Sequence, residues 1–280
     1  MRLFISLCLF FSLTQTIKAD VLVLVHGYMS GAKVWENTGI SEILQKNDWG
    51  RAGVLFPQTG FALASAYPGT KNKTYLVDLP SLAPLGLQAS LLKKALIGIE
   101  ITNPNDKIIL VGHSAGGVVA RMTLVQYGVG QVVKLITIAA PHSGTGKALE
   151  ALNFTHSSGP IGMIKSFFGG GRYHAVRSST PLLRDLSPPA TGNILSWLNF
   201  QPHPQIDYIS VVRAGAFGFS RDTIVPANSQ DMNNIPALAG KSSVVRVATG
   251  HLLSIQDGLG LVQLLKMQEI QNVIPEKKEK

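Results

Sequence analysis

Cysteine is almost absent from this 280-residue sequence. The single one, Cys8, lies in an apolar run at the N-terminus that we expect to be removed. Without it the chain has no cysteine, which excludes disulfide bonds, a cysteine nucleophile and cysteine-based metal sites. The fold must then be stabilised by its core alone, which the 45% hydrophobic content of a chain of this length allows.

Apolar runs long enough to cross a bilayer comfortably are also lacking. The N-terminal run, LFISLCLFFSL, follows Arg2 and is followed by polar TQT and then by Ala19. A basic start, a short apolar segment and a small residue are typical of a secretory signal peptide. We expect residues 1–19 to be removed and the mature chain, without a transmembrane segment, to be exported to the periplasm or the exterior. An uncleaved anchor and a buried N-terminal helix are the alternatives.

Acidic residues are few, and basic residues are in excess. Without Arg2 and Lys18 the chain has 23 basic and 16 acidic residues, a net charge of +7. A nucleic-acid binder would concentrate this charge in runs with interleaved aromatic residues, but only the tail EKKEK is dense, and its charges alternate in sign. The pattern argues against a nucleic-acid partner. It leaves two readings open, a solvated basic surface and transient attraction to an anionic lipid surface.

Repeats and low-complexity linkers are absent, and short aliphatic runs alternate with helical stretches instead. Continuous apolar runs are typical of parallel strands buried on both faces. Strands are expected at 21–25, 107–111, 132–139, 206–213 and 243–248, with weaker candidates at 52–56 and 74–79. Helices are expected at 40–48, 85–101, 115–127 and 252–272. The alternation predicts an α/β fold: a compact, mostly parallel sheet of about six strands with helices on both faces.

Residues 144–200 interrupt this rhythm with SSGP, FFGGG and SPPATG. We interpret them as a cap or lid inserted into a single domain that spans 20–280. Within them, one face of the stretch GPIGMIKSFFGGGRYH would be apolar and flanked by glycines, which suits a lid that opens at a lipid surface. This face would consist of Ile161, Met163, Ile164, Phe167 and Phe168. A helix packed permanently on the sheet is the alternative.

The sequence around Ser114 has the pattern G-x-S-x-G, which by itself occurs by chance. Its context is more specific, because a strand pattern ends just before it and a helix pattern begins just after it. This is the setting of a nucleophile elbow, in which a strained turn exposes the serine hydroxyl. The turn is so sharp that a Cβ atom at Gly112 or Gly116 would clash. We therefore predict that Ser114 is a nucleophile.

A serine hydroxyl needs a base and a group that orients the base. In the nucleophile-elbow architecture these follow in the order acid, then histidine. Asp222 lies in the loop after the strand at 206–213 and is the preferred acid, whereas Asp207 begins that strand and Asp185 lies in the inserted segment. The preferred base is His251, which follows the last expected strand.

Backbone amides must stabilise the oxyanion that develops on the substrate. The residue after the nucleophile, Ala115, is one predicted donor. The second is Tyr28, in the loop after the first strand, with Met29 as the alternative. His26 is expected to hold this loop through hydrogen bonds rather than to act as the base.

Together these segments resemble the α/β-hydrolase family, and within it the branch of bacterial secreted lipases and carboxylesterases. The resemblance rests on VLVHGYMSG, GHSAGGVVAR, TIAAPHSGTG, RDTIVP and GHLLS, which occur in the family's order, and it runs from about residue 20 to 270. It implies hydrolysis of carboxylic esters of lipids through an acyl-enzyme, without a cofactor. It also places His26, Met29, His113 and His142 at the substrate cleft, with a purely structural role for His142 as the alternative.

Two departures from this branch qualify the resemblance. Many bacterial lipases bind calcium through an aspartate just after the catalytic histidine, whereas here LLSIQD follows His251 and the nearest acid, Asp257, is too distant. We therefore predict no metal. The leading antiparallel strands of larger members are missing as well, so the sheet should be compact.

Three functions remain distinguishable. The preferred one is a secreted triacylglycerol lipase or carboxylesterase acting on a lipid or a small ester. The same triad would also serve a phospholipase, or a lipid acyltransferase that passes the acyl group to an alcohol. A non-catalytic binding protein with the same fold is the third, although such chains usually lose the serine, the histidine or an elbow glycine.

Overall fold

The computed structural model of the chain describes residues 20–64, 70–156, 173–190, 192–215 and 220–273. The expected signal peptide at 1–19 lies outside the described residues. So does the expected apolar lid face formed by Ile161, Met163, Ile164, Phe167 and Phe168. Among the residues that are described, no helix is long and apolar enough to cross a membrane.

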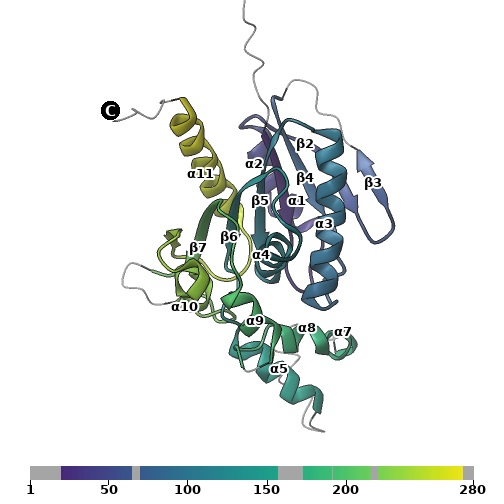
Figure 1. The fold of residues 1–280 in the computed structure, drawn as a ribbon, viewed down its shortest axis with the longest axis vertical. Coiled ribbons are helices and arrows are strands. Elements are labelled where there is room, and N and C mark those ends of the chain that lie inside the picture. Colours follow the sequence, from purple (N-terminus) through teal and green to yellow (C-terminus); the bar gives the residue numbers. More distant parts are fainter. Residues whose placement is uncertain (1–19, 65–69, 157–172, 191, 216–219, 274–280) are drawn as a thin grey trace, which may run out of the picture.

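One eight-stranded sheet forms the centre of the molecule, in the order β3-β2-β4-β1-β5-β6-β7-β8 (Figure 1). All neighbouring strands run parallel except β2 and β3, which form an antiparallel pair at one edge. The strands are β1 (Asp20–Val25), β2 (Trp49–Phe56), β3 (Phe61–Ala64), β4 (Asn72–Val77), β5 (Lys107–His113), β6 (Val132–Ile138), β7 (Asp207–Arg213) and β8 (Ser242–Val247).

The predicted α/β class and mostly parallel sheet are confirmed. The sheet exceeds about six strands because both weaker candidates form strands, β2 and β4, and because β3 pairs with β2. The expected helices are present as α2 (Ile40–Gln45), α3 (Leu85–Thr102), α4 (Ala115–Tyr127) and α11 (Ile255–Val273).

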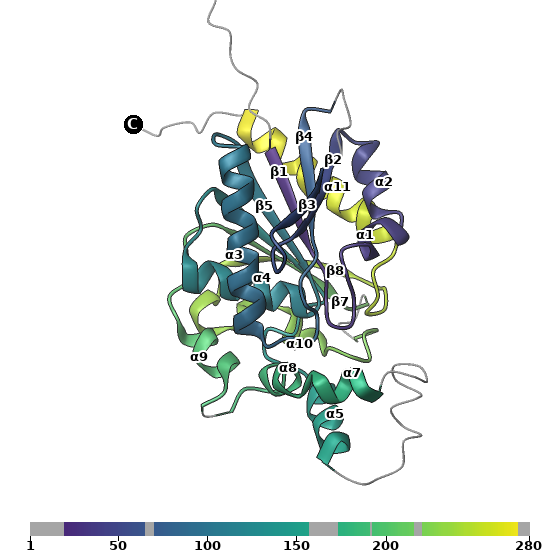
Figure 2. The ribbon, with the colours of Figure 1, turned by 90° about the vertical axis from the view of Figure 1, so that its right-hand side faces the viewer.

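Helices cover both faces of the sheet, so the central strands are buried on both sides (Figure 2). In β1 the side chains of Val21, Val23 and Val25 pack with α3 and α4. Those of Leu22 and Leu24 point the other way and pack with α1 (Val34–Asn37), α2 and α11. This alternation explains why β1 is apolar at every position after its first residue, since both faces need an apolar side chain.

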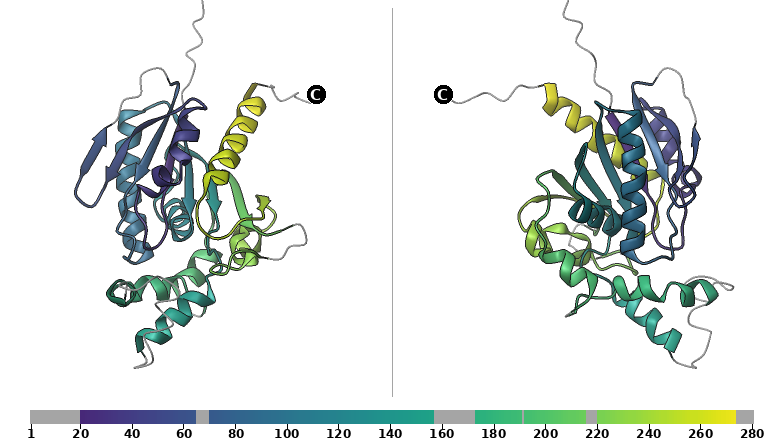
Figure 3. Two further views of the ribbon diagram at one scale, coloured as in Figure 1. Left: turned by 180° about the vertical axis from the view of Figure 1, so that it is seen from behind. Right: turned by 45° about the vertical axis from the view of Figure 1, so that its right-hand side comes forward.

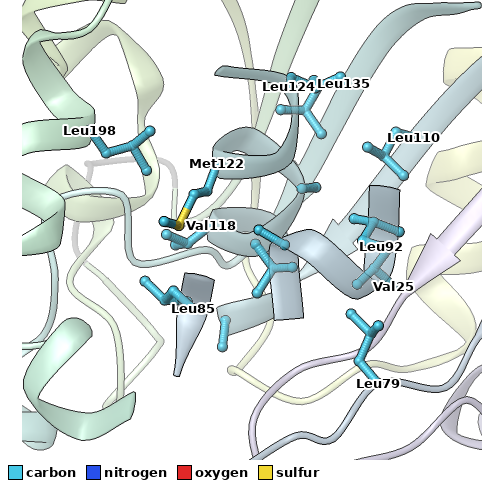
Figure 4. Packing of buried hydrophobic residues seen from close by; sticks show 14 of the residues in the cluster. Val25, Leu79, Leu85, Leu92, Leu110, Val118, Met122, Leu124, Leu135 and Leu198 are labelled. Carbon is cyan, nitrogen blue, oxygen red and sulfur yellow. The ribbon is translucent and has the colours of Figure 1, made fainter. Parts of the chain in front are cut away.

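The first of these two cores is shown in Figure 4, where Val25 and Leu110 from the sheet lie near Leu92 of α3, and Val118 and Met122 of α4 lie near Leu85. Burial of each leucine side chain stabilises the fold by about 1.5–3 kcal/mol. The same core includes Leu198, which belongs to the segment inserted after β6.

The inserted segment forms a layer of short helices beyond one end of the sheet (Figures 1 and 3). These helices are α5 (Gly146–His156), α7 (Tyr173–Ser178), α8 (Thr180–Asp185) and α9 (Ile194–Phe200). Leu182, Leu183 and Leu195 are buried and join the first core cluster. The described part of this cap therefore shares a core with the sheet.

The remaining short elements connect β7 to β8. They are α10 (Ala227–Gln230), η1 (Met232–Asn234) and η2 (Pro236–Leu238). The buried side chains of Met232, Ile235 and Leu238 attach this connection to the first core cluster. It thereby fixes the loop after β7, which carries one of the predicted site residues.

Candidate active site

Ser114 lies in the single-residue turn between β5 and α4, with φ 52° and ψ −129°. A positive φ is uncommon for a residue with a side chain and costs on the order of 1–3 kcal/mol. The turn is held by two hydrogen bonds, because the Ser114 amide donates to the Ile138 carbonyl (2.8 Å) and the Gly117 amide donates to the Ser114 carbonyl (3.0 Å). Adjacent elements therefore maintain the strained conformation.

The glycines around this turn allow backbone segments to approach closely. A Cβ atom on Gly112 would lie 2.5 Å from Gly117 Cα, and one on Gly116 would lie 2.2 Å from the His26 carbonyl oxygen. Gly117 would place a Cβ 2.6 Å from Ala140 Cβ. The elbow thus packs between the end of β1 and the end of β6, and side chains at these positions would push it out of place.

Three predicted side chains meet at the carboxyl edge of the sheet. The Ser114 hydroxyl lies 2.9 Å from His251 Nε2, and His251 Nδ1 lies 2.7 Å from Asp222 Oδ2. Because a carboxylate accepts, Nδ1 carries the proton that is donated to Asp222, and Nε2 is left to accept from the serine. Ser114 lies in the β5–α4 turn, Asp222 in the loop after β7, and His251 in the loop after β8.

The Asp222 carboxylate has four hydrogen-bond donors. Besides His251, the amides of Ile224 (2.8 Å) and Val225 (2.9 Å) donate to Oδ1, and Gln230 Nε2 donates to Oδ2 (3.1 Å). Burial raises the pKa of Asp222, but the hydrogen bond and charge of His251 and the two amides outweigh it, so the pKa is lower than usual. The acid is therefore ionised at neutral pH and held in one orientation.

Gln230 is a site residue that sequence reasoning missed. Its buried amide group donates to Asp222 and to the Val225 carbonyl and accepts from the Arg213 amide (2.7 Å). No local pattern marks it, since a glutamine in a short helix eight positions after the acid matches no motif.

His113 connects the elbow to the histidine loop. Its Nε2 donates to the His251 carbonyl (2.9 Å), and the two rings lie 5.3 Å apart. Burial, then the charges of His251 and Arg213, lower the pKa of His113 to about 3. This imidazole is neutral at physiological pH and lines the cavity beside the serine.

The loop after β1 lies directly over the serine, where a Cβ on Gly27 would be 2.9 Å from Ser114 Cβ. His26 holds this loop, since its Nδ1 donates to the Gly27 carbonyl and its Nε2 accepts from the Leu79 amide, both at 3.0 Å. Burial lowers the pKa of His26. Tyr28 and Met29 line the cavity, and the Tyr28 hydroxyl lies 2.6 Å from Ser179 Oγ in the cap.

Two histidines expected at the cleft lie beneath it instead. His26 is 1% exposed and His142 is fully buried, and neither lines the cavity. His142 Nε2 lies 3.1 Å from Thr137 Oγ1, and burial sets its pKa well below the usual value. The residue follows β6 and its backbone amide donates to the Ser229 carbonyl (2.9 Å), so His142 is held in the interior and not at the cleft.

The cavity at Ser114 has a volume of about 470 Å³, within the usual range for a small-molecule site. Its wall is mostly apolar and contains no carboxylate among the described residues. It is lined by Gly27, Tyr28, Met29, Ser30, Val34, Thr38, His113, Ser114, Pro141, Thr145, Lys147, Ala148, Leu183, Leu186, Ile224, Val225, His251, Leu252 and Leu253. The described residues contain no group of three side chains suited to hold a metal ion.

Comparison with known proteins gives one family match. The model of the PGAP1-like alpha/beta domain matches residues 85–156, the part of the chain from α3 through the elbow to α5. Comparison with curated proteins gives no match.

Several solved structures share the fold over nearly the whole chain. The mature lipase BlEst2 of Bacillus licheniformis is 17% identical with a TM-score of 0.58, covering 90% of this chain and 92% of that chain. A lipase-esterase related protein of Clostridium acetobutylicum is 13% identical with a TM-score of 0.56, covering 90% and 95%. The esterase EaEST of Exiguobacterium antarcticum is 14% identical with a TM-score of 0.52, covering 90% and 92%. These likenesses show that the chain has the α/β-hydrolase fold.

Proposed function

We propose that this α/β-hydrolase-fold chain is an exported serine hydrolase that cleaves carboxylic esters of lipids through an acyl-enzyme. The observation that carries the proposal is the unbroken hydrogen-bond path from Ser114 through His251 to Asp222 at the wall of an apolar cavity. The fold shared with lipases and esterases supports it at the level of architecture.

The first half-reaction forms the acyl-enzyme. Ser114 Oγ attacks the ester carbonyl carbon while His251 Nε2 takes the hydroxyl proton, and Asp222 stabilises the imidazolium that results. The amides of Ala115, at the start of α4, and Tyr28 are the proposed donors to the carbonyl oxygen as it becomes negative. The intermediate then expels the alcohol, which receives its proton from His251.

The second half-reaction restores the enzyme. Water takes the position of the alcohol, His251 accepts a proton from it as it attacks the acyl carbon, and Ser114 leaves with that proton. His113 supports both halves by holding the His251 carbonyl while remaining neutral.

The cavity and its mouth favour a lipid ester as substrate. Leu183, Leu186 and Leu253 offer an apolar wall to an acyl chain. Leu252 also lines the cavity and is 76% exposed. An exposed leucine at a cavity that takes acyl chains favours transient contact with a lipid surface. An N-terminal signal peptide would deliver the chain to such a substrate outside the cytoplasm.

The proposal is tested with purified protein and p-nitrophenyl esters of increasing acyl length, measured below and above their aggregation point. Ser114→Ala should reduce kcat/KM by at least about 1000-fold, whereas the surface variant Ser90→Ala on α3 should match the wild type. Leu252→Ser should slow only the aggregated substrates. Equal turnover by Ser114→Ala and the wild type would refute the assignment.

A further inference from the structure

Arg213, the last residue of β7, carries a guanidinium that is fully buried. Its Nη1 lies 2.6 Å from Oδ1 of Asp257, whose side chain is 3% exposed. Asp257 lies in the first turn of α11, immediately after the loop that carries His251. The fold therefore places a buried ion pair beneath that loop.

The pair contacts both sides of the His251 loop. On one side, Arg213 Nη1 donates to Thr249 Oγ1 (2.7 Å), two residues before His251. On the other, Asp257 Oδ2 accepts from the amide of Ser254 (2.8 Å), three residues after it. The loop is thus anchored at both ends by side chains that contact neither Ser114 nor the cavity.

The backbone of Arg213 reaches the acid as well. Its amide donates to Gln230 Oε1 (2.7 Å), and Gln230 donates in turn to Asp222 Oδ2 (3.1 Å). Its carbonyl accepts from the amide of Arg221, the residue before Asp222 (3.3 Å). Arg213 therefore connects the loop that carries Asp222 to the loop that carries His251.

A buried ion pair is a poor device for stability alone, because the cost of desolvating both charges can exceed their attraction. Its directional hydrogen bonds fix geometry more narrowly than apolar packing would. We propose that Arg213, through Asp257 and Thr249, is a positioning residue that sets the distance between the His251 imidazole and the Ser114 hydroxyl. This inference rests on the proposed function.

The test separates positioning from stability by measuring kcat, KM and thermal unfolding for each variant. Arg213→Met should lower kcat about 10- to 100-fold with KM unchanged, because a displacement of 1 Å can cost that much. Arg213→Lys, which can hold only part of the network, should recover part of this loss. Thr249→Val removes a single hydrogen bond without leaving a buried charge unpaired, and it should lower kcat by a smaller factor.

The control is Lys134→Met. Lys134 is 5% exposed and pairs with Asp207 (3.3 Å) where β7 begins, at the opposite edge of the sheet, so its loss should lower stability and leave kcat unchanged. Unchanged kcat in folded Arg213→Met would overturn the inference. If Arg213→Met does not fold, unchanged kcat in Thr249→Val would overturn it. An inactive wild type would instead overturn the proposed function.

Discussion

At the scale of single residues, the site depends on glycines, which have no side chain, as much as on the side chains that meet there. The strained φ of Ser114 is maintained because Gly116 lets α4 approach the backbone that follows β1. Any Cβ at Gly116 would overlap the His26 carbonyl, and His26 in turn holds the loop over the serine. Elbow and loop are therefore one packed unit.

Gly116→Ala should destabilise the fold by roughly 2–4 kcal/mol and abolish ester hydrolysis, because backbone atoms must move apart. Gly98→Ala is the matched control in α3, where nothing lies within 4 Å of the new Cβ. It should stabilise the fold by about 1 kcal/mol, through helix propensity, and leave turnover unchanged. Urea unfolding and p-nitrophenyl ester hydrolysis measure both effects. Equal stability of the two variants would contradict the packing account.

At the scale of elements, the sequence predicts what is local or periodic. The apolar runs 21–25 in β1 and 108–111 in β5 are uninterrupted because both faces of these strands are covered, so the pattern identified them directly. The order of strand and loop also predicted which aspartate lies beside His251, because Asp222 follows β7 whereas Asp207 begins it.

Contacts between segments that are distant in the sequence have no comparable sequence pattern. Gln230 and the Arg213–Asp257 pair are ordinary polar residues until folding buries them together. His142 lies in a segment that resembles the family, yet it is fully buried, and its ring lies against Thr137 of β6 instead of lining the cavity. Sequence alone could not predict these outcomes, which depend on three-dimensional packing.

Asp185, the acid rejected in the cap, has a different task. Its Oδ2 accepts from the amide of Leu85, the first residue of α3, and so joins α8 to the start of a core helix (2.9 Å). Asp185→Ala should lower the free energy of unfolding by about 1–2 kcal/mol, as the loss of a helix cap does, with kcat unchanged. Asp222→Ala should lower kcat by at least about 1000-fold. A comparable loss of kcat in Asp185→Ala would contradict this division of roles.

At the scale of the whole molecule, the fold buries four histidines in neutral form. Burial is the main cause in each case, and it lowers the pKa of His113 to about 3 and that of His203 to about 4, while the pKa values of His26 and His142 are also lowered. The unfolded chain binds protons on these groups below their usual pKa of 6.5, and the folded chain does not. Stability therefore falls as the pH drops below that value.

Each of these histidines should contribute up to about 1.4 kcal/mol per pH unit to the loss of stability between pH 6.5 and the lowered pKa. Urea unfolding at pH 7.5, 6.5 and 5.5 measures how the free energy of unfolding changes with pH. Below pH 6.5, His203→Asn should reduce this slope by about 1.4 kcal/mol per pH unit, which corresponds to one proton. A free energy of unfolding that stays constant from pH 7.5 to 5.5 would show that these side chains are not neutral in the fold.

The account depends most on the claim that His251 activates Ser114 to form a covalent bond with its substrate. The most direct measurement is the intact mass of the protein after treatment with diethyl p-nitrophenyl phosphate, followed by mapping of the modified peptide. We expect a single diethyl phosphoryl group on Ser114 in the wild type, and a reaction at least about 100-fold slower in His251→Ala. Modification of a different residue, or equal rates in the two proteins, would contradict the account.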